Sequence, residues 1–159
     1  MKRTKKLLLV IFSMSILLAA FTANASAVSS SYDSDWRYWS QGGTGIGKNM
    51  QNYGCYIVSQ AKLLVESGII DSNQTFNPDT YANWGLETGN IQKNWTSSAY
   101  TAPNYAKALN KTLNYCGTKD LSKMTRAQQS ANIMEWLNDE YYVILAYSKP
   151  SSHFYYVLR

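Results

Sequence analysis

Residues 55–66 read Cys-Tyr-Ile-Val-Ser-Gln-Ala-Lys-Leu-Leu-Val-Glu and form the most regularly patterned segment of the sequence. The apolar residues of this segment recur with spacings of three, four and seven residues, which places them on one face of a helix. They are Ile57, Val58, Ala61, Leu64 and Val65. Gly68 suits the position just after a helix, where left-handed backbone is common. The pattern therefore predicts a buried helix that begins at Cys55.

The C-terminal part of the sequence has the composition of β-strands. Residues 142–147 read Tyr-Val-Ile-Leu-Ala-Tyr, and residues 153–158 read His-Phe-Tyr-Tyr-Val-Leu. Residues 148–152, Ser-Lys-Pro-Ser-Ser, separate them and are typical of a turn. Two such runs joined by a short polar connection predict an antiparallel hairpin.

Three more helices are predicted between these regions from residues that favour helix starts. Asn77-Pro78 predicts a helix over residues 79–86, and Ala102-Pro103 begins a second one that carries Tyr105 and Leu109. Thr125 caps a third, through Asn138. Its expected apolar face consists of Ala127, Ala131, Met134 and Leu137. Because the helices precede the strands, we expect an α+β fold with N-terminal helices packed on a C-terminal antiparallel sheet.

The first 27 residues have the composition of a secretory signal peptide. Four basic residues precede a 15-residue apolar run from Leu7 to Phe21, and small residues follow up to Ala27. A membrane-spanning helix needs about 20 apolar residues, so a permanent anchor is disfavoured. We expect cleavage near Ala27, secretion without a stable membrane anchor, a flexible lead-in over residues 28–35 and one domain over 36–159.

The basic character of the chain resides in this leader. The full chain of 159 residues has a formal net charge of +5, with 15 cations and 10 acids. Because the leader holds four of the cations and none of the acids, the mature chain is nearly neutral. A nearly neutral protein lacks the charge that typifies nucleic-acid binding. We therefore expect no nucleic-acid partner.

Three common kinds of site are disfavoured by the residues present. Residues 42–49 nearly match the phosphate-binding pattern G-x-x-x-x-G-K-[ST], but Asn49 stands where the magnesium-binding hydroxyl belongs. With one His and two Cys far apart in sequence, the chain also lacks metal-ligand spacing. The acidic residues Glu87, Glu135, Asp139 and Glu140 show no spacing that selects a glycosidase pair. We expect neither a metal nor a cofactor.

Cys55 and His153 are the remaining candidates for chemistry. A thiol at a helix N-terminus lies at the positive end of the helix dipole, which favours the thiolate. A His that opens a strand can then serve as the base. The alternative is that Cys55 is a buried apolar residue, or that it forms a disulfide with Cys116, as secreted proteins often do.

Four segments, in their order along the chain, resemble the C39-like branch of the papain-like cysteine peptidases. They are Trp39-Ser40-Gln41, Tyr53-Gly54-Cys55-Tyr56-Ile57-Val58-Ser59-Gln60-Ala61, Asn77-Pro78 and Ser152-His153-Phe154-Tyr155-Tyr156-Val157. The resemblance covers about residues 36–158. It implies a papain-like fold in which Cys55 is the nucleophile, His153 the base and Gln41 an oxyanion-hole donor. Asn49 and Gln51 are nearer alternatives for the oxyanion role.

The sequence departs from the family at the third catalytic position. The family sets an Asp or Asn on the strand after the His, whereas this sequence ends at Arg159. We therefore expect the domain to be C-terminally short relative to the family. Another residue, with Asn49 and Asn52 the nearest candidates, then orients the imidazole, or activity is weakened or lost.

The resulting expectation is a secreted cysteine peptidase that hydrolyses peptide or amide bonds by a Cys/His mechanism. Its substrates would be peptides, proteins or cell-wall peptides, and the oligomeric state is left open. The alternative is a catalytically degenerate, secreted binding domain of the same fold.

Overall fold

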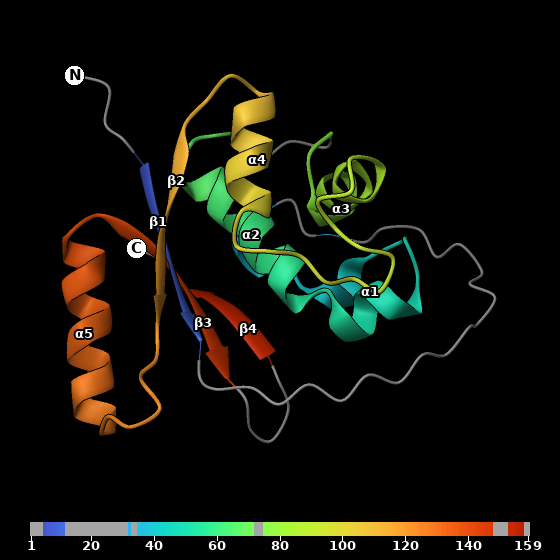
Figure 1. The fold of residues 1–159 in the computed structure, drawn as a ribbon. Helices are drawn as coiled ribbons and strands as arrows, with labels where there is room; N and C mark the ends of the chain where they lie inside the picture. Colours follow the sequence, from blue (N-terminus) through green and yellow to red (C-terminus); the bar gives the residue numbers. More distant parts are fainter. Residues whose placement is uncertain (1–4, 12–31, 33–34, 72–74, 148–152, 158–159) are drawn as a thin grey trace.

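The computed structural model of the 159-residue chain describes residues 5–11, 32, 35–71, 75–147 and 153–157. The helices of this part are α1 (Lys48–Tyr53), α2 (Cys55–Glu66), α3 (Pro78–Glu87), α4 (Thr101–Ala108) and α5 (Arg126–Asn138), with 3₁₀ turns η1 (Trp36–Tyr38) and η2 (Gln41–Gly43). Its strands are β1 (Lys5–Ile11), β2 (Leu113–Lys119), β3 (Tyr141–Tyr147) and β4 (His153–Val157). Helix α5 lies on one side of the sheet and the other helices lie on the opposite side (Figure 1).

The main core forms around α2, as its apolar pattern predicts. Ile57, Ala61, Leu63 and Leu64 are fully buried. The helix packs against β4, α3 and α4, and the ring of Tyr56 lies 4.4 Å from that of Phe154 on β4. Gly68 follows the helix with a φ of 63°. The predicted helix and its glycine end are confirmed, and the predicted face is buried except at Val65, which is half-buried.

The two faces of the β3–β4 hairpin pack against different helices. The strands are antiparallel, with Tyr147 opposite His153 and Val143 opposite Val157, as predicted. On one face, Phe154 and Tyr156 pack into the α2 core. On the other face, Val157 packs in a second cluster with residues of α5. Alternate residues of β4 therefore belong to opposite sides of the sheet.

The sheet as a whole is mixed, so the expectation of a purely antiparallel sheet is wrong. Its strand order is β2-β1-β3-β4, and β1 runs parallel to both β2 and β3. The α+β class holds in its general form, since the chain combines helices with one small sheet. Strand β1 lies within the predicted signal peptide, whereas the expected cleavage position near Ala27 lies outside the described residues.

The other predicted helices are present, each with the expected start to within a residue. Asn77 and Thr125 each form a capping box at the start of α3 and α5. The predicted face of α5 is right at Leu137 but wrong at Ala127, Ala131 and Met134, which are exposed. Ile133 and Trp136 pack beside Leu137 against Leu121 and Val143.

Besides β1, the sequence did not predict helix α1, strand β2 or an anchored residue in the lead-in. Helix α1 begins at Lys48, inside the glycine-rich residues 42–49. Tyr32, inside the predicted flexible lead-in, packs on Trp39 and donates a hydrogen bond to Asp79. In the part of the chain that the structure describes, no helix has the length and apolar character needed to cross a membrane.

Replacement of Gly54 by alanine is expected to lower the free energy of unfolding. An alanine Cβ there would lie 2.5 Å from the carbonyl oxygen of Met50, so the junction between α1 and α2 must shift. Overpacking of this kind costs about 1–3 kcal/mol. Urea titration of Gly54→Ala measures the loss. The matched control is Gly42→Ala, whose added Cβ would meet only the Ser40 hydroxyl at 3.6 Å. Equal stabilities of the two variants would contradict the packing argument.

A chain that begins at Val28 is expected to be less stable than the full chain. It lacks β1, whose backbone pairs with both β2 and β3. Each net hydrogen bond contributes about 0.5–1.5 kcal/mol, so the loss should reach several kcal/mol in urea titrations of the two chains. Equal stability of the two chains would show that β2 and β3 hold without β1. That result is what a signal peptide that is removed on export requires.

Candidate active site

Cys55 is the first residue of α2 and lies directly after a tight helix junction. Gly54 ends α1 and precedes α2: its N–H donates to the Met50 carbonyl, and its carbonyl accepts from the Val58 N–H. The Cys55 side chain is half-buried and carries a free thiol. Cys116 is exposed on β2, and the two cysteines form no disulfide, so the predicted alternative of a bridge between them is wrong for this structure.

Two opposing effects act on the pKa of the Cys55 thiol. Burial raises it and is the larger effect, while backbone hydrogen bonds from Phe154, Tyr56 and Cys55 itself lower it. The helix start thus favours the thiolate, as expected, but desolvation outweighs it. The net pKa is raised, so the neutral thiol predominates at pH 7. This corrects the expectation of an activated thiolate.

His153 lies on the face of β4 that points away from α2. Its ring contacts that of Tyr155, two residues along the strand, at 4.5 Å between centroids. Phe154, between them, points to the opposite face and packs on Tyr56 of α2. The hairpin packs β4 on α2, and the side chain at the start of β4 that faces this helix is Phe154. Alternation along β4 thus directs the His153 side chain away from α2, and the expected Cys55–His153 pair stays a prediction.

Gln41 lies beside the helix junction that precedes Cys55. Its side-chain amide donates to the carbonyl of Gln51 in α1. Helix carbonyls point toward the residue four positions later, so this contact places the amide within a turn of Cys55. An amide nitrogen carries two hydrogens, and the second is available to an oxyanion. The Gln41 side chain is thus held against α1, the helix that leads into Cys55.

Helix α1 also carries the predicted alternatives: Asn49 and Gln51 for the oxyanion role, and Asn49 and Asn52 for orienting the His153 ring. Asn49 and Asn52 are exposed, while Gln51 is half-buried and uses its carbonyl to hold Gln41. Helix α1 lies with α2 on one side of the sheet (Figure 1). Alternation along β4 directs His153 to the other side. Neither asparagine is therefore placed to orient His153.

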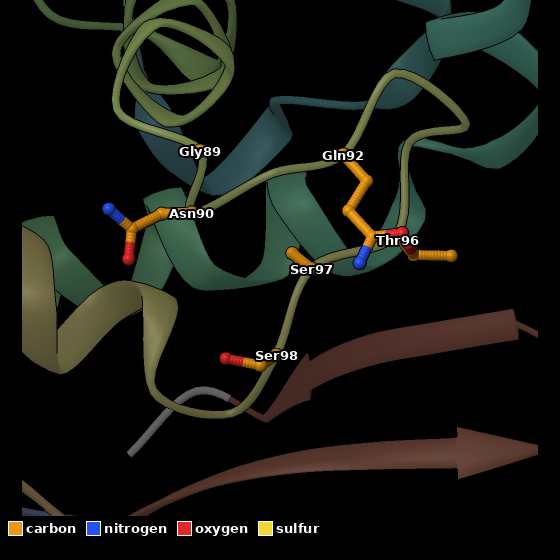
Figure 2. A pocket seen from close by; sticks show the side chains of 6 residues that line it. All are labelled: Gly89, Asn90, Gln92, Thr96, Ser97 and Ser98. Carbon is orange, nitrogen blue, oxygen red and sulfur yellow. Dashed lines mark hydrogen bonds between the residues drawn. The ribbon is translucent and has the colours of Figure 1, made fainter.

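A polar hollow of about 300 Å³ lies beside the segment that follows α3. It is lined by Gly89, Asn90, Gln92, Thr96, Ser97 and Ser98, with Gln92 reaching toward Thr96 (Figure 2). Beneath it, the buried Gln60 of α2 donates to the Ser98 carbonyl and accepts from the Ser97 and Tyr81 hydroxyls. The lining has only neutral side chains and none of the predicted catalytic residues. Over the described ranges, no cluster of three metal-ligating side chains occurs.

Sequence reasoning missed Asp79, the buried carboxylate of α3. It accepts hydrogen bonds from the hydroxyls of Tyr32 and Thr44 and from the N–H of Gly45. Burial raises the pKa of Tyr32, and the nearby Asp79 charge raises it further. The signal for this cluster was present in Asn77-Pro78-Asp79, because acidic residues favour the first turn of a helix. Its partners Tyr32, Thr44 and Gly45 are far away in sequence, so no local pattern could predict them.

An electrophilic thiol probe is expected to label Cys116 faster than Cys55 at neutral pH. Cys116 is exposed, whereas Cys55 is half-buried and burial raises its pKa. Since the thiolate reacts, the labelling of Cys55 should rise with pH and reach half its maximum above about 8.5, the pKa of an unperturbed thiol. Peptide mass spectrometry follows each site, and the unfolded chain is the control. Faster labelling of Cys55 would mean that an imidazole reaches it in solution.

Comparisons with protein-family models, with curated proteins and with solved structures found no match to this chain. The function must therefore be argued from the site itself.

Proposed function

We propose that the chain is a cysteine peptidase of the C39-like, papain-like type, which hydrolyses peptide or amide bonds with Cys55 as the nucleophile. The proposal includes secretion after removal of the leader and peptide, protein or cell-wall peptide substrates. Removal of the leader takes β1 out of the sheet, so this part of the proposal requires β2 and β3 to hold without it. One observation supports it: β4, which begins with His153, the chain's one histidine, packs on α2, which begins with Cys55. The nucleophile and the strand that bears the base thus meet.

The expected chemistry uses three groups. His153 takes the proton of the Cys55 thiol, and the sulfur attacks the carbonyl carbon of the scissile bond. The Gln41 amide and the Cys55 N–H donate to the oxyanion of the tetrahedral intermediate. The protonated His153 then gives its proton to the leaving amine. Water hydrolyses the resulting thioester, with His153 acting as base again.

This mechanism requires a change in β4. Side chains alternate along a strand, so a shift of one residue against β3 would turn His153 toward α2 and Phe154 away from it. The register with Tyr147 opposite His153 is therefore the inactive arrangement in this proposal. Since Phe154 is packed on Tyr56, the shift must also replace that aromatic contact.

The second candidate is a catalytically degenerate binding domain of the same fold. The observation that favours it is the placement of His153 against Tyr155, away from the thiol. Tyr155 in turn contacts Tyr147, and the two rings are 52% and 49% exposed. This face presents aromatic surface rather than a nucleophile and its base.

Cys55→Ala and His153→Ala are each expected to lower kcat/KM on peptide substrates. Loss of a general base costs about 10²–10⁴-fold, and loss of the nucleophile costs at least as much. The assay follows cleavage of a mixed peptide library by mass spectrometry. Tyr155→Ala, on the same face of β4, is the matched control and should retain cleavage. If Cys55→Ala inactivates but His153→Ala does not, His153 is not the base. If the unaltered protein cleaves nothing, the binding domain is the better candidate.

The Phe154→His variant is expected to show which of the two registers β4 adopts in solution. In the register of this structure it places an imidazole on the face of Cys55. If that register persists in solution, the variant should gain hydrolysis and faster Cys55 labelling, because a neighbouring imidazole favours the thiolate. If His153 already reaches Cys55 by the shifted register, the added imidazole faces away and gives no gain. Phe154→Tyr is the control for altered packing.

A further inference from the structure

Asp79 is a buried charge that the proposed mechanism does not use. Its side chain belongs to the first turn of α3 and is 6% exposed. Two of its three donors, the Thr44 hydroxyl at 2.5 Å and the Gly45 N–H at 2.7 Å, belong to the segment that follows Gln41. The third is Tyr32 at 2.9 Å. Burial of a carboxylate is costly unless donors compensate it, and here three donors converge.

The contacts of Thr44 lead from Asp79 to Gln41. The Thr44 N–H donates to the Gln41 carbonyl, while the Thr44 hydroxyl donates to Asp79 and accepts from the Ile46 N–H. At its other end, the side chain of Gln41 donates to the Gln51 carbonyl. The backbone of Gln41 is therefore linked to Asp79 through Thr44, and its side chain is bound to α1.

We propose that Asp79 is a positioning residue that, through Thr44, fixes the segment carrying Gln41 beside the N-terminus of α2. An oxyanion donor contributes only when it is already aimed at the developing charge, so a rigid support for Gln41 affects the transition state rather than substrate binding. The catalytic part of this inference rests on the proposed function. The mechanical part, the restraint of residues 41–45 by Asp79, does not.

The test compares Thr44→Val with Thr44→Ser in the full chain. Valine keeps the shape of the side chain but removes the hydroxyl that joins Asp79, whereas serine keeps that hydroxyl. Hydrogen exchange at residues 41–45 measures how firmly this segment is restrained. The kcat and KM for a cleaved peptide measure whether the restraint affects catalysis. Asp79→Asn is the second variant, since its amide group would set a donor against the donors of Thr44 and Gly45. Asp71→Asn, at an exposed position, is the matched control.

We expect Thr44→Val and Asp79→Asn to speed exchange at residues 41–45 by about tenfold or more, and to lower kcat by about 10–100-fold with KM nearly unchanged. Thr44→Ser and Asp71→Asn should behave like the unaltered chain. Unchanged exchange in both Thr44→Val and Asp79→Asn would overturn the inference. Faster exchange with unchanged kcat would overturn its catalytic part. If the unaltered protein hydrolyses nothing, the proposed function fails, while the exchange result still decides the restraint.

Discussion

The packing of β4 on α2 is the contact on which the rest of the structure depends. Phe154 inserts against Tyr56, and with Tyr156 it joins the strand to the main core. Because side chains alternate along a strand, this one contact also decides that Val157 packs toward α5 and that His153 lies beside Tyr155. The core and the candidate site are thus coupled through the direction of a single strand. No substitution that repacks Phe154 can leave the surroundings of Cys55 unchanged.

The same contact explains the chemistry of the thiol. Packing β4 on α2 removes water from Cys55, which raises its pKa, and at the same time brings the backbone of Phe154 into hydrogen-bond contact with it. Burial and activation therefore have one cause, and a thiolate requires a further favourable charge. An imidazolium on the α2 face would supply that charge, whereas the ring of Phe154 cannot. The raised pKa and the outward-facing His153 are two consequences of one register.

Local patterns predicted most of the elements, and long-range pairing limited what they could predict about the site. The helices at Cys55, Asn77 and Thr125 follow from spacing and from capping residues, which act over a few positions. The face of α5 was misjudged because Met134 and Ile133 are equally apolar, and only the position of the sheet distinguishes them. The parallel pairing of β1 has no local signal either, because its seven residues read equally well as the start of a signal peptide. For the candidate site, the sequence identified Cys55, Gln41 and the strand of His153, but not the direction of that side chain or the role of Asp79.

The two candidate functions also differ in which side chains of β4 must point toward α2. A peptidase must place His153 on the α2 face, and this exchanges the aromatic contact of Phe154 for a polar one beside a half-buried thiol. That exchange is costly unless the imidazole pairs with the thiolate, because an ion pair offsets the desolvation that each group suffers alone. The thiol and the imidazole therefore stabilise each other's active form, and the shift, the thiolate and the charged ring should arise together or not at all. A binding domain has no such requirement, since it can keep Phe154 in the core and present Tyr147 and Tyr155 on its surface.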